Sequence, residues 1–263
     1  EQAQQLSAIA VKMGKKLSIH LKIDTGMNRL GFQINGKTIN DIYKIFNLAG
    51  LEIRGIYTHF SEADNKYSDF TQVQFERFMR FLSDLDNEGL RIPLRHCANS
   101  AGIIDYPETH LDMVRAGICI YGLYPSPEML NKIKLKPAMT LKTRIASLKY
   151  VRKGETISYG RTYKAQEVRR IATLPIGYAD GYSRALSNRG RVLIKGEYAG
   201  VVGRVCMDQL MVDVTDNENR LEIGDEVIVF GQGSHGQNVR VDEIANVLGT
   251  INFENSDGDG PFP

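Results

Sequence analysis

Two segments in the first half of the chain follow apolar runs with side chains suited to handling protons or phosphate. His59 comes just after the run 51–57, and imidazole is the one unperturbed side chain that exchanges a proton near neutral pH. The segment HCANSAG offers Asn99, Ser100 and backbone N–H groups of the kind that cradle phosphate. Each signal is weak alone, because a structural histidine explains the first equally well. Both segments are candidates for a site.

Basic side chains mark two more segments. HLKIDTGMNRLGF carries Lys22 and Arg29 at the end of a predicted strand. MVRAGICIY carries Arg115 near Gly117, where a ligand can approach the backbone closely. A half-buried lysine, a solvated arginine and a buried structural arginine are the alternative interpretations. The formal net charge is only +2, so any anion site must be local.

The second half of the chain adds the segments ISYGRTY, PIGYADGY and GRVCMDQ. They place Tyr159, Tyr178, Met207 and Asp208 beside glycines at predicted turns. Singly, tyrosines in such places are usually packing residues. A function for these side chains therefore depends on the rest of the pattern.

The elements that must position these residues change character along the chain. Up to about residue 131, short β-rich runs alternate with helical patterns, which predicts βα units around a parallel sheet. After Pro125 and Pro127, short β-like runs separated by glycine turns predict a second, mostly β domain. The predicted strands are 17–23, 51–57, 94–98 and 114–123, then 139–151, 168–175, 191–194, 199–205, 210–214 and 226–230, with helices at 38–49 and 68–87.

Two local signals refine this outline. Lys195, Gly196 and Glu197 join two apolar runs, and Gly196 can supply the positive φ of a tight hairpin turn. Residues 253–263 are rich in glycine, proline and acidic side chains, which predicts a disordered tail.

Composition excludes several classes of function. The near-neutral charge provides no broad field for nucleic acid or an anionic membrane, and no stretch of 18 apolar residues occurs. Three cysteines without Cys-x-x-Cys spacing argue against a disulfide framework and against a zinc site, so we expect no metal. We expect a cytoplasmic protein.

The seven segments, in their order and close to their spacings, resemble those of bacterial alanine racemases over about residues 6–252. The resemblance implies an α/β fold: the C-terminal half of a (β/α)₈ TIM-type barrel at 1–131, then a β-rich C-terminal domain at 132–252. A closed barrel needs eight strands and typically ~250 residues. About four strand candidates precede residue 131, so we expect roughly half a barrel.

The resemblance also implies a cofactor and a reaction. Pyridoxal 5'-phosphate (PLP) would assist the interconversion of L- and D-alanine by two bases, which supplies D-alanine for peptidoglycan. Tyr159 would be one base, activated through His59 by Arg115. Arg115 would also donate a hydrogen bond to the pyridine nitrogen.

Other roles follow from the same resemblance. Arg29 and the backbone amide of Met207 would hold the substrate carboxylate, Asp208 follows in the same motif, and Tyr178 would narrow the entrance. Lys22 matches a position that some family members carry as a carbamate. In a homodimer, the second domain of one subunit would complete the site of the other. The implied cofactor-binding residues are His59, Asn99, Ser100, Arg115, Gly117 and Ile118.

The sequence departs from the family pattern at both ends. No Val-Lys-Ala-Asn-Ala-Tyr-Gly-like motif with the PLP lysine occurs, so we expect negligible racemase activity from this polypeptide alone. Phe253 and a polar tail stand where family members have an apolar strand with a tyrosine. The alternatives are a racemase of serine or another small amino acid, and a non-catalytic PLP-binding remnant or complementing fragment. A related decarboxylase is disfavoured by the ISYG and CMDQ segments.

Overall fold

The computed structural model describes residues 1–131, 133–233 and 236–252. Its contacts divide the chain into two units, Glu1–Lys136 and a second that begins at Pro137. Each unit is described by itself below. The tail predicted at 253–263 lies outside the described residues. Within the described residues, no helix is long and apolar enough to cross a membrane.

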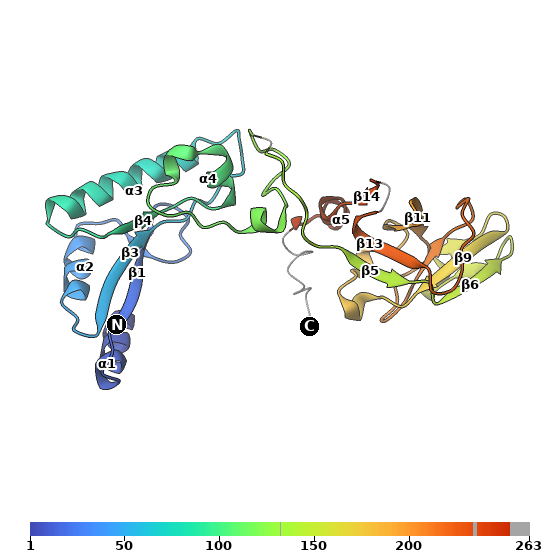
Figure 1. Cartoon of the computed structure of the whole chain (residues 1–263), viewed down its shortest axis with the longest axis horizontal. Coiled ribbons are helices and arrows are strands. Elements are labelled where there is room, and N and C mark those ends of the chain that lie inside the picture. Colours follow the sequence, from blue (N-terminus) through green and yellow to red (C-terminus); the bar gives the residue numbers. More distant parts are fainter. Residues whose placement is uncertain (132, 234–235, 253–263) are drawn as a thin grey trace. The chain divides into compact units, whose positions relative to one another are not determined.

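The first unit is a parallel sheet with helices (Figure 1). Its strand order is β2-β1-β3-β4, and every pairing is parallel. The parallel βα arrangement predicted for this half is therefore present. The strands are β1 Leu17–Asp24, β2 Phe32–Gln33, β3 Leu51–Tyr57 and β4 Leu94–His96, and the helices are α1 Gln2–Lys12, α2 Thr38–Phe46, α3 Phe70–Asn87 and α4 Ser100–Asp105, with 3₁₀ turns at Pro107–Thr109 and Ile118–Tyr121.

The two faces of this sheet differ in polarity, because successive side chains of a strand point to opposite faces. One face carries Ile23 and Ile56, which are fully buried in a cluster with Ile42 of α2 and Phe78 of α3. Burying such a side chain contributes about 1.5–3 kcal/mol. The other face carries polar and ring side chains. By strand register these are His20, Lys22, Tyr57 and His96, with Gly55 opposite His20.

One predicted strand of this unit is wrong. Residues 114–123 form a loop and the 3₁₀ turn Ile118–Tyr121 instead of a strand. Gly122 ends that turn with a φ of 76°, a left-handed conformation that differs from regular strand backbone. The fourth strand is β2, which at two residues is too short to produce a period-2 pattern.

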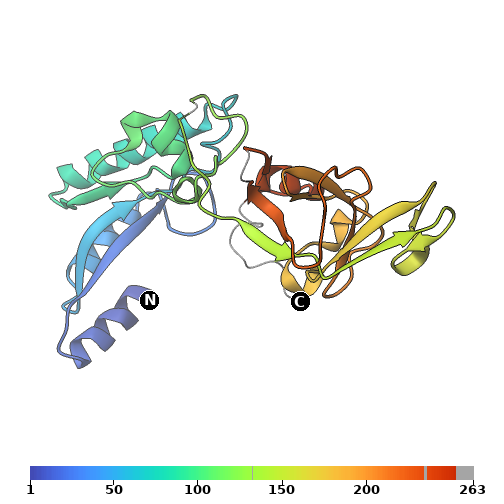
Figure 2. The ribbon, with the colours of Figure 1, turned by 45° about the vertical axis from the view of Figure 1, so that its right-hand side comes forward.

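The second unit is mostly β-structure. Seven strands follow the order β14-β13-β10-β11-β12-β9-β6, β5 pairs with β13, and β7 pairs with β8. Strands β6 and β9 run side by side (Figures 1 and 2). The elements are β5 Leu141–Arg144, β6 Ser147–Val151, β7 Thr156–Ile157, β8 Tyr163–Lys164, β9 Arg169–Leu174, β10 Arg191–Ile194, β11 Glu197–Val201, β12 Leu210–Asp213, β13 Glu226–Gln232, β14 Asn238–Val239 and α5 Val241–Leu248, with 3₁₀ turns at Tyr159–Arg161, Tyr178–Asp180 and Arg184–Leu186.

The predicted hairpin is confirmed. Ile194 pairs with Glu197, so Lys195 and Gly196 form a two-residue loop between β10 and β11. Their φ angles are 48° and 85°, and two positive φ angles match the turn type that suits the twist of a hairpin.

Candidate active site

Arg115 is the centre of the polar cluster in the first unit. Its Nη1 donates to Nδ1 of His96 at 2.6 Å. Its Nη2 donates to the Thr58 carbonyl at 2.8 Å, to Nδ1 of His59 at 3.1 Å and to the Cys97 carbonyl at 3.2 Å. The structure thus brings together His59 and Arg115, two of the three side chains expected to form a proton relay.

Buried hydrogen bonds behind the cluster fix the loop after β3. Oγ1 of Thr58 lies 2.7 Å from Oγ1 of Thr25, at the end of the neighbouring strand. Gln74 of α3, fully buried, donates to the Thr25 hydroxyl and to the His59 carbonyl, and it accepts from the Ser61 amide. Because a lost partner would leave a buried amide unpaired, this network constrains His59 strongly.

Burial and nearby cations set the protonation of the two histidines around Arg115. Burial, then Arg115, lowers the pKa of His59 to about 4, and the cations of Arg29 and Lys22 add to the effect. The same two main causes lower the pKa of His96 to about 4. Burial and Arg29 also lower the pKa of Lys22. Both histidines are therefore neutral at pH 7 beside a guanidinium.

We expect the first unit to lose stability between about pH 6.5 and 4. The folded pKa values of His59 and His96 lie below the unfolded value, so the unfolded chain binds more protons there and stability falls as pH falls. After discounting for solvent screening, the slope is on the order of 1 kcal/mol per pH unit. Urea denaturation across this range measures it. His96→Gln should flatten the slope; equal slopes in the wild-type and His96→Gln proteins would contradict the assignment.

The expected phosphate-binding residues form a second group in the first unit. Ser100 Oγ accepts from the amide of Gly117 at 2.9 Å and of Cys119 at 3.3 Å. This contact joins the start of α4 to the turn that contains Ile118. Asn99 caps α4, because its Oδ1 accepts from the Gly102 amide at 2.9 Å.

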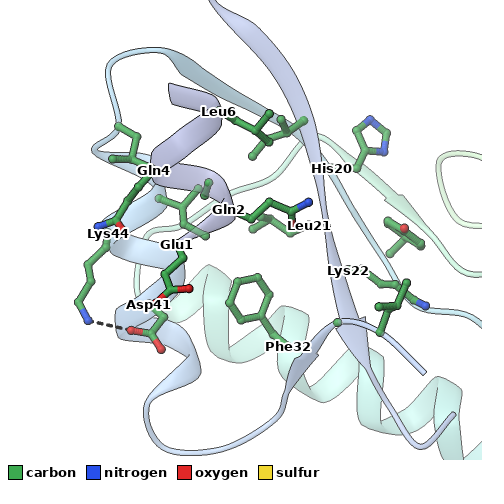
Figure 3. Close-up of a pocket in the computed structure, with 17 residues that line it drawn as sticks. Glu1, Gln2, Gln4, Leu6, His20, Leu21, Lys22, Phe32, Asp41 and Lys44 are labelled. Carbon is green, nitrogen blue, oxygen red and sulfur yellow. Dashed lines mark hydrogen bonds and ion pairs between the residues drawn. The ribbon is translucent and has the colours of Figure 1, made fainter. Parts of the chain in front are cut away.

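Lys22 and Arg29 lie at the carboxyl end of β1 and in the turn after it. Asp24 holds this turn, since its Oδ1 accepts from the amides of Gly26 at 2.9 Å and Asn28 at 3.0 Å. A pocket of about 840 Å³ runs along β1 and is lined by His20 and Lys22. Figure 3 shows both side chains projecting from β1 on the side away from Leu21.

The expected residues of the second unit lie on loops joined to one another. The amides of Tyr178 and Ala179 donate to the carbonyls of Cys206 at 2.9 Å and Met207 at 2.8 Å. The contact is so close that a Cβ on Gly177 would lie 2.3 Å from the Cys206 carbonyl oxygen. Gly177 is therefore required where these two loops meet.

The Tyr159 loop is attached to the same group of loops. Ser158 Oγ donates to the Arg204 carbonyl at 2.6 Å. Ser158, Gly160 and Arg161 all have positive φ angles, of 63°, 68° and 53°. At non-glycine residues such angles cost on the order of 1–3 kcal/mol and are found at functional sites. This backbone leaves the side chain of Tyr159 71% exposed.

The sequence interpretation missed His20 and His96 as site residues, although each begins a segment singled out above. His20 Nδ1 lies 2.8 Å from His96 Nε2, and the Tyr57 ring stacks on His96 with centroids 4.9 Å apart. Only the strand register, which aligns Tyr57 with His96, indicates that these side chains belong to the cluster. No group of His, Cys, Asp and Glu with the geometry of a metal site occurs in the described part of the chain.

Comparisons with known proteins match both units. Residues 1–125 match the family model for the N-terminal domain of alanine racemase, and residues 138–257 match that for its C-terminal domain. An alanine racemase of Clostridium perfringens is 50% identical over 255 residues, which are 97% of this chain and 66% of that protein. The chain thus spans about two-thirds of the length of such relatives.

Solved structures agree with these matches. An alanine racemase of Clostridium difficile superposes with a TM-score of 0.91 at 43% identity, over 96% of this chain and 65% of that one. One from Bartonella henselae with covalently bound pyridoxal phosphate gives 0.81 at 26% identity, over 96% and 67%. A parallel α/β unit followed by a β unit, each matched by one of the two domain models, defines the two-domain architecture of this class of proteins. The chain belongs to the alanine racemase family.

Proposed function

We propose that this chain provides two-thirds of a catalyst that interconverts L- and D-alanine with PLP. The observation that carries the proposal is the contact of Arg115 with His59, at the carboxyl ends of parallel strands, in a chain of this family. Active sites of parallel α/β folds form at that edge of the sheet. The four strands of the first unit would be part of a (β/α)₈ barrel over residues 1–131, and the β-rich domain would follow at 132–252.

The residues present fit PLP. Lys22 and Arg29 are basic side chains near Arg115, and Asp24 is a carboxylate that acts on Lys22. The hydroxyl of Ser100 and the amide of Ile118 would hold the phosphate, and the amide of Gly117 would donate to it in place of its present contact with Ser100 Oγ, with Asn99 fixing α4. When bound, PLP makes the α-proton of an amino acid acidic.

Protein groups would move that proton. The phenol of Tyr159 would exchange it with the α-carbon on one face. His59 is neutral and accepts from Arg115 at Nδ1, so its Nε2 carries the proton and can donate to the Tyr159 oxygen. A hydrogen bond to the charged form, close to the Arg115 cation, favours the phenolate. The remaining N–H groups of Arg115 would face the pyridine nitrogen.

The substrate carboxylate would be bound by Arg29 and the Met207 amide, next to Asp208. Burial and Arg29 lower the pKa of Lys22, which increases the fraction of neutral amine, the form that reacts with carbon dioxide to give a carbamate. Tyr178 would limit the size of the substrate side chain. Tyr159, Tyr178 and Met207 would act on the partner's first unit in a homodimer. Serine is the alternative substrate, since it differs from alanine by one hydroxyl.

A second candidate function is that of a complementing fragment. Between Leu17 and Lys22, β1 pairs only with β3 among the described strands, so its other edge is free there. The pocket along this edge includes the apolar side chains of Leu6, Leu21 and Phe32 (Figure 3). A parallel strand from another polypeptide would find both hydrogen-bonding groups and apolar surface there.

Complementation tests both candidates. The chain is mixed with PLP and a polypeptide corresponding to the first third of the Clostridium perfringens relative. The optical rotation of L-alanine and of D-alanine solutions is then followed. We expect racemisation only with all three components. Borohydride should then attach PLP covalently to the protein, which the absorbance of PLP would report. A stable complex that racemises neither alanine nor serine would overturn the catalytic proposal. Faster turnover of serine than of alanine would make serine the proposed substrate in place of alanine.

A further inference from the structure

A chain of hydrogen bonds extends from Arg115 beyond the groups given roles above. Nη1 of Arg115 lies 2.6 Å from His96 Nδ1, and Nε2 of His96 lies 2.8 Å from His20 Nδ1. His96 is 3% exposed and stacks on Tyr57. The chain of contacts therefore crosses the polar face of the sheet from β4 to β1.

Only one arrangement of protons satisfies these contacts. A guanidinium can only donate, so Nδ1 of His96 must accept and carries no proton. The proton of neutral His96 is then on Nε2, where it donates to His20 Nδ1. His20 must accept in turn, so it is neutral with its own proton on Nε2. Arg115 thus favours the Nε2–H tautomer of His96 from one side of the ring, and the acceptor on His20 favours the same tautomer from the other side.

The His20 ring lies against the backbone of the neighbouring strand at Gly55. His20 pairs in register with Gly55 of β3, and a Cβ on Gly55 would lie 2.5 Å from the His20 Nδ1 and Cε1 atoms. The ring thus occupies the space that any other residue at position 55 would fill. The ring lies over Gly55 with its Nδ1 toward His96, although His20 is otherwise exposed.

We propose that His20 is a positioning residue: by accepting from His96 Nε2, it stabilises the His96 tautomer that accepts from Arg115, and so helps to orient the guanidinium. The consequence for catalysis rests on the proposed racemase function, but the tautomer does not. Without an acceptor at His20, the Nε2–H of His96 would lose its partner, and the Nδ1–H tautomer, which cannot accept from Arg115, would become accessible.

The tautomers can be measured on the full chain without PLP or alanine. Long-range ¹H–¹⁵N correlation spectra of ¹⁵N-histidine-labelled protein at pH 7 should show His20, His59 and His96 as neutral Nε2–H forms, with each signal assigned by single substitution. In His20→Phe, which keeps an aromatic ring but has no acceptor, the His96 signals should move to a mixture of tautomers. His20→Asn, whose carbonyl can replace Nδ1 as acceptor, should restore the single form, and His110→Phe should leave His96 unchanged.

Two results would overturn the proposal. One is a wild-type His96 that is an imidazolium or carries its proton on Nδ1; the other is a His20→Phe spectrum in which His96 keeps its single tautomer. If His20→Phe does not fold, the wild-type spectrum and the folded His20→Asn variant still decide. Failed complementation with normal tautomers would reject the racemase function alone, and abnormal tautomers with successful racemisation would reject only the role of His20.

Discussion

Replacing Tyr159 by phenylalanine should reduce racemisation by the complemented assembly about 10³-fold, because a positioned acid–base group typically contributes 10²- to 10⁴-fold. The substitution removes one oxygen from a side chain that is 71% exposed, so folding of the second unit should not change. Initial rates from L-alanine and from D-alanine, together with uptake of solvent deuterium at the α-carbon, measure the effect.

A difference between the two enantiomers in the loss of activity would identify Tyr159 as the base on one face of the α-carbon. If Tyr159 serves one face of the α-carbon, deuterium uptake from one enantiomer should persist while conversion to the other stops. Tyr150→Phe is a matched control, since that tyrosine is 72% exposed and has no proposed role. Full racemase activity in the Tyr159→Phe assembly would show that the base is elsewhere.

Gly177→Ala should destabilise the second unit by about 3 kcal/mol, at the upper end of the usual cost of overpacking. The new Cβ would lie 2.3 Å from the Cys206 carbonyl oxygen and 2.5 Å from the Met207 carbonyl carbon, and neither backbone atom can rotate away. The loops of Tyr178 and Met207 would have to separate. Urea denaturation of the full chain, followed by a probe in the second unit, measures the change.

Gly200→Ala is the matched control for this substitution. Gly200 is in β11, and a Cβ there would meet no atom within 4 Å. It should change stability by less than about 1 kcal/mol, because alanine is slightly better than glycine in a strand. Similar losses in both variants would mean that contact with the Cys206 loop does not determine the need for glycine at position 177.

Elements with strong periodicity were predictable from the sequence, and those defined by tertiary context were not. β1, β3 and α3 carry long apolar patterns, and their predicted positions agree with the structure to within two residues. The loop at 114–123 reads as a strand because it is apolar, yet Gly117 and Gly122 bend it. Helices α1 and α5 were missed, although α5 is bounded by Gly249 at a φ of 71°.

Some of the residues chosen from the sequence contact one another in the structure, but the network that they form could not be predicted. His59, Arg115, Ser100 and Gly117 were chosen from motifs, and the structure shows the contacts Arg115–His59 and Ser100–Gly117. The sequence could not show that Arg115 also binds His96, because that contact depends on how far β4 extends along β3. Motifs identify residue types, whereas strand register determines which of them meet.

The edge of β1 at residues 17–22, where no described strand pairs with it, bears on how this polypeptide behaves in concentrated solution. Exposed N–H and C=O groups along an extended strand can pair with the same strand of another copy, which is a common beginning of aggregation. A polypeptide bound along residues 17–22 would remove that possibility. Association at this edge would therefore protect the protein from self-assembly, independently of any contribution to chemistry.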